Sequence, residues 1–153
     1  MDKLAIKPIT IKEANEFVKA HHRHSKPTQG GRFAVGATFD NELVGVAIVG
    51  RPISASIKDK LTAEITRLCA APTAPKNTCS FLLGRCWRIW QQMGGATMIT
   101  YTLQEENGAS LRGAGWEQVA EVKPSNWNRP DRPRKHQSIY DKKKWKLKQQ
   151  KKD

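Results

Sequence analysis

Glu64-Ile-Thr-Arg-Leu-Cys69 and, after a seven-residue linker, Asn77-Thr-Cys-Ser80 are the stretch that decides the fold of this sequence. The first piece has the apolar content of a buried strand, and the second has the polar start of an amphipathic helix. A charge inside a buried strand is costly unless it is paired or used, so Glu64 and Arg67 stand out. The helix start offers free backbone N–H groups and the positive end of the helix dipole, where phosphate binds well. This combination favours an enzyme that holds a phosphorylated cofactor beside a functional carboxylate.

Hydrophobic periodicity predicts the elements on either side of this stretch. We expect strands at 4–9, 33–39, 43–49, 62–69, 97–102, 116–122 and 144–147, and helices at 10–22, 77–93 and 107–112. Thr10 and Glu13 form a capping box for the first helix. Their order predicts an α/β (α+β) single domain with a central mixed, mostly antiparallel sheet flanked by helices. We expect residues 1–147 to form this domain and 148–153 to form a basic tail.

Length and composition limit the class of protein. A chain of 153 residues is long enough for one full core. It has no run of about 18 apolar residues that would span a membrane, and its first residues lack the apolar core of a signal peptide. Cys69, Cys79 and Cys86 form no CxxC pair, which favours reduced and mostly buried thiols. These features predict a cytoplasmic protein without a membrane partner; its oligomeric state, monomer or dimer, stays open.

The net charge of +13 is concentrated near the C-terminus. Residues 121–153 hold twelve Lys/Arg against four Asp/Glu, which places +8 of the charge there. Trp127, Tyr140 and Trp145 are interleaved with these charges and can stack on bases. We therefore expect nucleic acid, DNA or tRNA, as a partner, although a solvated basic tail is the alternative. The candidate contacts are Arg129, Arg132, Arg134, Lys135, Lys142, Lys143 and Lys144.

The order of elements and the segment Asn107-Gly-Ala-Ser-Leu-Arg-Gly-Ala-Gly-Trp116 resemble the GNAT acetyltransferases. The resemblance implies acetyl-CoA, or another acyl-CoA, as cofactor. It implies that backbone N–H groups near Leu68 and Cys69 hold the pantetheine, and that the helix start binds the pyrophosphate. The implied cofactor residues are Arg67, Leu68, Cys69, Asn77, Thr78, Cys79, Ser80, Asn107 and Ser110. Residues 71–76 contain no glycine, unlike the glycine-rich pyrophosphate loop of that family, and capping by Asn77 or Thr78 is the alternative reading of the helix start.

A second resemblance is to small phage and prophage proteins of GNAT type and, more distantly, to the Mom family of phage DNA-modification proteins. It is carried by His21-His22, Gly50-Arg-Pro52, Glu64-Ile-Thr-Arg-Leu68, Asn77-Thr-Cys-Ser80 and Thr100-Tyr-Thr102. This resemblance implies a phage or prophage gene expressed in a bacterial host. Leu103 stands where the Mom family has an aspartate.

Acyl transfer to an amine needs a base, a stabilised oxyanion and a proton for the leaving thiolate. Glu64 is the candidate base, and its alternative role is a structural pair with Arg67 or Arg51. Strand alternation predicts opposite faces for Glu64 and Arg67. His22 is a second candidate base or substrate contact, and Tyr101 is a candidate acid or a core residue.

No metal is expected, because no Cys, Asp or Glu stands at ligand spacing beside His21, His22 and His24. The sequence predicts a GNAT-type N-acyltransferase that acts on an amine of, or attached to, a nucleic acid: phage DNA or an aminoacyl-tRNA. Two alternatives remain open. One is a non-catalytic GNAT-fold module that binds nucleic acid or protein, and the other is a Mom-like enzyme that modifies adenine in DNA.

Overall fold

The computed structural model describes residues 3–21, 31–52, 60–103, 111–112, 114–122 and 142–148. They form one seven-stranded sheet in the order β1-β2-β3-β4-β5-β7-β6. The elements in chain order are β1 Ala5–Ile9, α1 Ile11–His21, β2 Phe33–Phe39, β3 Glu42–Gly50, β4 Thr62–Ala70, α2 Thr78–Gln92, β5 Thr97–Leu103, β6 Glu117–Val122 and β7 Lys142–Lys148. Neighbouring strands are antiparallel except β4 and β5, which are parallel. The predicted mixed, mostly antiparallel sheet is confirmed.

Helix α1 begins with the predicted capping box. The backbone N–H of Glu13 donates to Thr10 Oγ1 at 3.0 Å, and the backbone N–H of Thr10 donates to Glu13 Oε1 at 3.2 Å. These bonds satisfy two donors that have no partner inside the helix. Ala14 and Val18 are buried against the sheet.

The hairpin of β2 and β3 turns at Asp40 and Asn41. Both residues have positive φ, 53° and 65°, as a two-residue type I′ turn requires. Asn and Asp tolerate this conformation better than other residues with a side chain, so the local sequence fixes the strand pairing.

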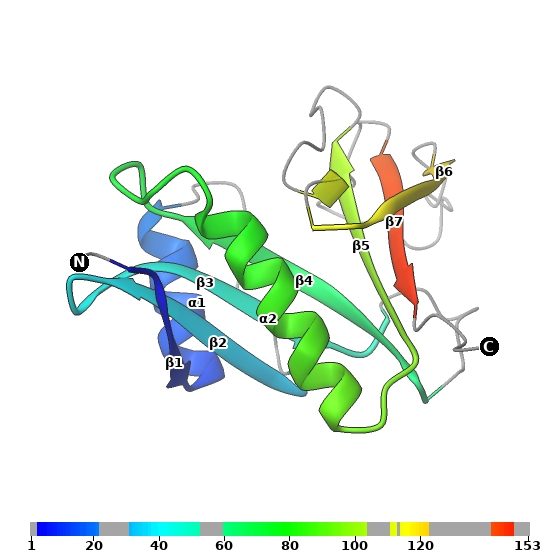
Figure 1. The fold of residues 1–153 in the computed structure, drawn as a ribbon, viewed down its shortest axis with the longest axis horizontal. Helices are drawn as coiled ribbons and strands as arrows, with labels where there is room; N and C mark the ends of the chain where they lie inside the picture. Colours follow the sequence, from blue (N-terminus) through cyan, green and yellow to red (C-terminus); the bar gives the residue numbers. More distant parts are fainter. Residues whose placement is uncertain are drawn as a thin grey trace, which may run out of the picture.

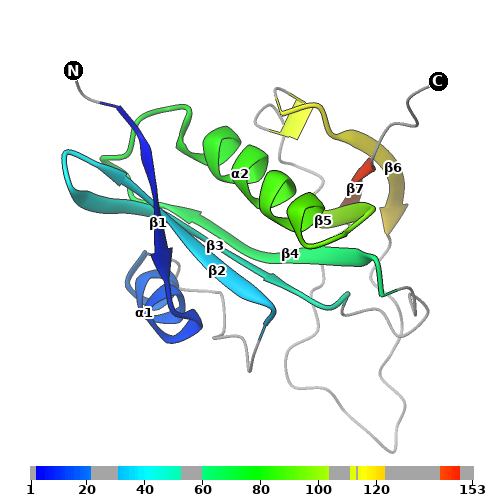
Figure 2. The same cartoon turned by 60° about the horizontal axis from the view of Figure 1, so that its bottom comes forward.

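The two helices cover opposite faces of the sheet (Figures 1 and 2). On the α1 face, Val46, Ile48 and Cys69 pack with Ala14 and Val18. On the α2 face, the apolar residues of β2 to β4 pack with Leu82, Leu83, Cys86 and Trp90. The spacing of apolar residues predicts a core-facing stripe for this helix, and these four residues confirm most of it. The predicted stripe is Cys79, Leu82, Leu83, Cys86, Ile89, Trp90 and Met93. Met93 departs from it: its side chain is 56% exposed, because α2 ends at Gln92 and Gly94 turns the chain with φ 93°.

Trp90 joins the end of α2 to the residue just before β4 and to the first residue of β5. Its indole Nε1–H lies 2.9 Å from the carbonyl oxygen of Thr97 and 3.1 Å from that of Leu61. Gly95 lies against the same indole, and a Cβ at that position would overlap the ring. This contact fixes where the parallel pair of strands begins.

The half of the sheet formed by β5, β7 and β6 has Trp145 at its centre. Trp145 is fully buried and packs in the same core as Met98, Leu111 and Trp116. Arg112 stacks over the Trp145 ring at 5.1 Å. Of the predicted helix at 107–112, Leu111 and Arg112 are helical and the rest lies outside the described residues. The division of the chain at residue 147 stays a prediction, with β7 running to Lys148.

Candidate active site

A β-bulge in β4 changes the faces on which the polar residues of Glu64–Cys69 lie. Arg67 pairs with Ile48 and Ile65 pairs with Val49, so Thr66 is an extra residue between them. The Thr66 hydroxyl donates to the carbonyl oxygen of Ile48 at 3.3 Å, which holds the irregularity in place. A bulge interrupts the strict alternation of side chains between the two faces of a strand.

Glu64 and Arg67 therefore lie on one face of the sheet, and the prediction of opposite faces was wrong. Glu64 pairs with Gly50 and Arg67 pairs with Ile48, two residues of β3 that share the α1 face. Electrostatics agree with this placement: burial lowers the pKa of Arg67, while the nearby charge of Glu64 raises it. The Arg67 guanidinium also donates to the carbonyl oxygen of Thr66 at 2.6 Å. Glu64, only 4% exposed, is thus a buried carboxylate with a cation beside it.

The strands β4 and β5 part immediately after Glu64. Their parallel pairing covers Thr62–Glu64 and Thr97–Ile99, and each strand then continues without the other. We call this point the β4–β5 fork. The buried Thr100 hydroxyl donates to the carbonyl oxygen of Ile65 at 3.0 Å, which satisfies a backbone acceptor just beyond the last strand pair.

Tyr101 lies on the Glu64 face of the fork. Ile99 is the strand partner of Glu64, and Tyr101 follows it by two residues and so shares its face. The half-buried Tyr101 hydroxyl has a pKa raised by burial and, to a lesser extent, by the charge of Glu64. Tyr101 is thus held as a neutral phenol close enough to Glu64 to feel its charge.

The N-terminal turn of α2 lies against β3 at Gly45. A Cβ at Gly45 would come 2.8 Å from Thr78 Cγ2 and 3.2 Å from the carbonyl oxygen of Cys69. Only glycine permits so close an approach, and it brings the helix start to the end of β4. Thr78 is buried, and its hydroxyl donates to the carbonyl oxygen of Pro75 at 2.7 Å.

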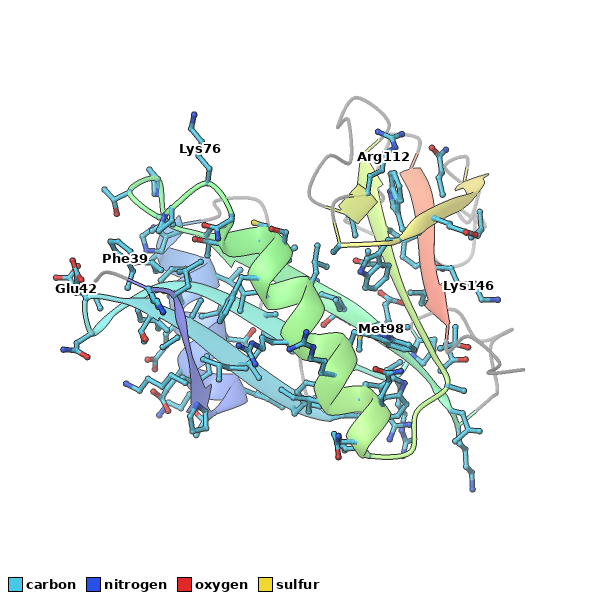
Figure 3. The ribbon with its side chains drawn as sticks, in the orientation of Figure 1. Phe39, Glu42, Lys76, Met98, Arg112 and Lys146 are labelled. Atoms are coloured by element: carbon cyan, nitrogen blue, oxygen red, sulfur yellow. The ribbon has the colours of Figure 1, made fainter. Side chains whose placement is uncertain are left out.

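Asn77 is the N-cap of α2 but makes no cap hydrogen bond through its side chain, contrary to the capping alternative for that residue. The N–H groups of Cys79 and Ser80 in the first turn have no acceptor within the helix. Lys76 is exposed at this end of α2 (Figure 3). Arg85 lies about two turns into the helix, 5.2 Å over the Phe81 ring. N–H donors and two cations fit the pyrophosphate of a coenzyme A derivative.

Two successive turns build the glycine-free linker before α2. The backbone N–H of Ala74 donates to Ala71 at 2.9 Å, and that of Thr78 donates to Pro75 at 3.1 Å. Pro72 occupies the second position of the first turn, where its fixed φ is favourable. Proline-based turns thus bring the chain from β4 to the helix start without glycine.

The three thiols are free. Burial raises the pKa of Cys86 to about 12, and burial together with nearby Cys79 raises that of Cys69 to about 11. Both thiols are therefore neutral at physiological pH and poor nucleophiles, consistent with the prediction of mostly buried thiols. Cys79 is half-buried, and burial raises its pKa as well.

We expect these two buried thiols to make the fold sensitive to alkali. Both thiols bind protons more tightly in the folded than in the unfolded state, so their stabilisation is complete below about pH 8.5. As the pH rises further, the unfolded state loses its thiol protons first, and each thiol lowers the free energy of unfolding by about 1.4 kcal/mol per pH unit. Urea unfolding under reducing conditions at several pH values above 8 would measure this slope. Cys86→Ala should be less stable at pH 8 but show a shallower slope, whereas an unchanged slope would contradict the assignment.

Several predicted site residues cannot be placed in this arrangement. His22, Asn107, Ser110, Arg129, Arg132, Arg134 and Lys135 lie outside the described residues. The structure brings Glu64, Arg67 and Tyr101 together on one face of the fork, and it brings the end of β4 close to the first turn of α2. Leu68 packs with the α2-side core, whereas Arg67 lies on the other face, so a cofactor role for Arg67 stays a prediction.

Sequence reasoning missed three residues that shape the site. These are Thr66 in the bulge, Gly45 under the helix start and Thr100 at the fork. Glycine within a strand often marks a close backbone approach, so Gly45 carried a usable signal. The bulge at Thr66 had no comparable signal in the sequence.

Comparison with known families identifies the chain. The model of the Mom protein family matches residues 3–153. The chain belongs to the Mom family. A search of curated protein sequences gave no match.

Solved structures show that this Mom-family chain has the GNAT fold. It is similar to the ribosomal-protein-S18-alanine N-acetyltransferase of Escherichia coli, with a TM-score of 0.67, 14% identity, and 95% of this chain and 94% of that chain covered. The structure of yncA from Salmonella typhimurium with its cofactor acetyl-CoA has a TM-score of 0.67 and 15% identity, with 95% of this chain and 93% of that chain covered. A Bacillus subtilis acetyltransferase in complex with CoA has a TM-score of 0.63 and 13% identity, with 98% of this chain and 100% of that chain covered. The predicted GNAT fold and Mom similarity are both confirmed. No helix in the described part of the chain is long and apolar enough to cross a membrane.

Proposed function

We propose that this protein is an acyl-CoA-dependent N-acyltransferase whose acceptor is an amine of, or attached to, a nucleic acid. The observation that carries the proposal is the buried Glu64 carboxylate at the β4–β5 fork, with Tyr101 and Arg67 on the same face. A buried carboxylate beside a phenol at the edge of a strand pair is typical of acid–base chemistry. The GNAT fold and the donors at the start of α2 support an acyl-CoA as the second substrate.

The residues of the fork can divide the proton transfers between them. An acyl-CoA, when bound, supplies a thioester carbonyl, and the start of α2 with Lys76 and Arg85 would hold its phosphates. Glu64 accepts the proton that the amine loses as the new C–N bond forms, directly or through a water molecule. Tyr101, held as a neutral phenol, donates its proton to the sulfur as the C–S bond breaks. Transfer of the proton from Glu64 to Tyr101 restores both groups, so charge and protons balance.

Arg67 has a supporting role in this scheme. Its guanidinium lies beside Glu64 and favours the ionised form of that carboxylate. An ionised carboxylate is the form that can act as a base. Arg67 also keeps the carboxylate charge compensated in its buried position.

Membership of the Mom family favours a second, narrower candidate. The exocyclic amine of adenine in DNA would be the acceptor, as the Mom resemblance implies. Leu103, at the end of β5, occupies the place of that family's aspartate. Incubation of the protein with acetyl-CoA and either DNA or aminoacyl-tRNA, followed by mass spectrometry of the released nucleosides and amino acids, would identify the acceptor. Addition of an acetyl group to neither substrate, by a protein that binds acetyl-CoA, would favour the non-catalytic binding module.

We expect Ser80→Asp to abolish acyl-CoA binding without unfolding the protein. The substitution loses the hydrogen bond that the Ser80 hydroxyl donates to the carbonyl oxygen of Asn77 at 3.1 Å, but the new charge offsets this loss. A carboxylate in the first turn of α2 interacts favourably with the helix dipole, typically by about 0.3–1 kcal/mol. The same charge would repel the phosphates that this turn is proposed to hold. Acetyl-CoA should raise the melting temperature of the native protein, because it binds only the folded state. In Ser80→Asp the melting temperature without ligand should be equal or higher, and the shift with acetyl-CoA should vanish.

Gln92→Asp is the matched control for this charge. It adds the same carboxylate to the same helix, but at the last residue of α2, far from the proposed phosphate site. It should lower the stability slightly, because a negative charge is unfavourable at the negative, C-terminal end of the helix dipole. The rise in melting temperature with acetyl-CoA should be unchanged. Equal ligand shifts in Ser80→Asp and the native protein would contradict the proposed phosphate site.

A further inference from the structure

Strand β7 distributes its lysines unevenly between the two faces of the sheet. Its sequence is Lys142-Lys-Lys-Trp-Lys-Leu-Lys148, and all seven residues pair with β5 without any shift of register. Successive residues of a strand belong to opposite faces. Positions 142, 144, 146 and 148 therefore share one face, and positions 143, 145 and 147 share the other. By register, four of the five lysine positions of β7 belong to one face of the sheet.

The lysine-rich face of β7 is the face that carries the candidate active site. Trp145 belongs to the other face, because it is fully buried in the α2-side core. The register partner of Lys144 is Tyr101, and that of Lys146 is Ile99, the residue that also pairs with Glu64. Glu64 on β4, Ile99 on β5 and Lys146 on β7 are thus side by side on one face of three adjacent strands. Figure 3 shows Lys146 on β7, in the half of the sheet beyond the fork.

The neighbouring strand β6 contributes little opposite charge to this face. Its partners for positions 146, 144 and 142 are Glu117, Ala120 and Val122. Of these three lysines, only Lys146 has an acidic register partner among the described residues of β6, since Glu121 pairs with Lys143 on the other face. Like charges at successive positions of one face repel each other, so a row of lysines is unfavourable without counter-ions. A polyanion that supplies several charges in a row offsets this repulsion.

We propose that Lys142, Lys144, Lys146 and Lys148 form a phosphate-binding track that holds a nucleic-acid strand beside Tyr101. Residues on one face of a strand recur every two positions, at about 6.7 Å, an interval of the same order as that between consecutive phosphates of a nucleic-acid strand. Adjacent strands lie about 4.8 Å apart, so a backbone that follows β7 passes next to Tyr101 and Glu64. The track adds to the proposed function the place where the nucleic-acid acceptor binds. It rests on the proposed function only for the acyl transfer that follows binding.

The control for this track lies within the same strand. Lys144→Gln and Lys143→Gln remove the same charge from neighbouring positions on opposite faces. Binding of labelled duplex DNA, single-stranded DNA and tRNA of mixed sequence would be measured by fluorescence anisotropy over a range of salt concentrations. Lys144→Gln and Lys146→Gln should each weaken binding several-fold at low salt. Each should also reduce the slope of log K against log salt by about 0.9 for duplex or 0.7 for single strands, the value of one lost phosphate contact. Lys143 is among the contacts that the sequence alone predicts, but its position belongs to the other face and pairs with Glu121 of β6, so Lys143→Gln should leave both quantities nearly unchanged.

Three outcomes would overturn the track. One is an equal loss in Lys143→Gln and Lys144→Gln, which would show a general effect of net charge without preference for a face. Another is unchanged binding in Lys144→Gln and Lys146→Gln, which would place the contacts elsewhere in the chain. The third is no binding of any of the three nucleic acids by the native protein. Melting temperatures of all variants would verify that each one folds.

Calorimetry with acetyl-CoA on the same variants separates this inference from the proposed function. Loss of nucleic-acid binding with intact acetyl-CoA binding supports the track and leaves the cofactor site in place. A native protein that binds nucleic acid through β7 but does not bind acetyl-CoA would support the track and contradict the acyltransferase. The probe with the highest affinity identifies the form of nucleic acid that the track accepts: duplex DNA, single-stranded DNA or tRNA.

Discussion

Glu64→Gln should lower the turnover of the acyl-transfer reaction by about two to four orders of magnitude, the usual contribution of a positioned base. Glutamine keeps the shape of the side chain but cannot accept the proton of the amine. Acetyl-CoA binding should be unchanged, because the proposed phosphate contacts lie at the start of α2. The pH–rate profile of the native enzyme should have an ascending limb that the variant lacks. Steady-state kinetics and calorimetry on the same preparations would measure both effects.

Because Arg67 lies beside Glu64, a variant that changes both residues separates a catalytic from a structural role of Glu64. Removing Glu64 alone leaves the half-buried charge of Arg67 without the nearby carboxylate that compensates it, which is destabilising. The double variant Glu64→Gln/Arg67→Gln removes both charges and should recover much of the lost stability. If Glu64 is the base, turnover stays low in the double variant. Recovery of turnover together with stability would show that Glu64 serves only as the partner of Arg67. Glu42→Gln, at an exposed position of β3, should change neither property.

Gly95→Ala should destabilise the protein by about 3 kcal/mol, because the added Cβ overlaps the Trp90 indole. Trp90 cannot move away without giving up its hydrogen bonds to Leu61 and Thr97. For a chain of this length, the loss corresponds to a fall of roughly 6–12 °C in melting temperature. Thermal unfolding followed by circular dichroism would measure it.

Gly84→Ala is the control for Gly95→Ala, because the same substitution should here stabilise the protein. Gly84 lies within α2, and a Cβ there would meet nothing within 4 Å. Alanine favours the helix over glycine by about 0.5–1 kcal/mol, so the melting temperature should rise. Combining Gly95→Ala with Trp90→Leu tests the mechanism, because a smaller side chain at residue 90 should make the added methyl group less costly. Equal costs of Gly95→Ala in both backgrounds would show that the indole is not what opposes the methyl group.

Local sequence signals determined most of the secondary structure. Thr10 and Glu13 predicted the start of α1, because a capping box needs only two residues of one turn. The apolar stripe of α2 and the alternation in β2 follow from the fixed periods of helices and strands. Asp40 and Asn41 suit the turn between β2 and β3, because Asn and Asp accept positive φ more readily than most residues. The charged residues of β4 marked the candidate site, because buried charges have few structural uses.

The tertiary structure decided which of these residues act together. Alternation alone placed Glu64 and Arg67 on opposite faces, and the bulge at Thr66 reversed that result. A bulge arises from the match between two strands and is invisible in either strand alone. The sequence likewise marked the C-terminal lysines as basic, but only the pairing of β7 between β5 and β6 placed half of that strand on the Glu64 face. Periodicity is a property of a segment, whereas register and face depend on partners far away in the chain, and here they set the geometry of the candidate site.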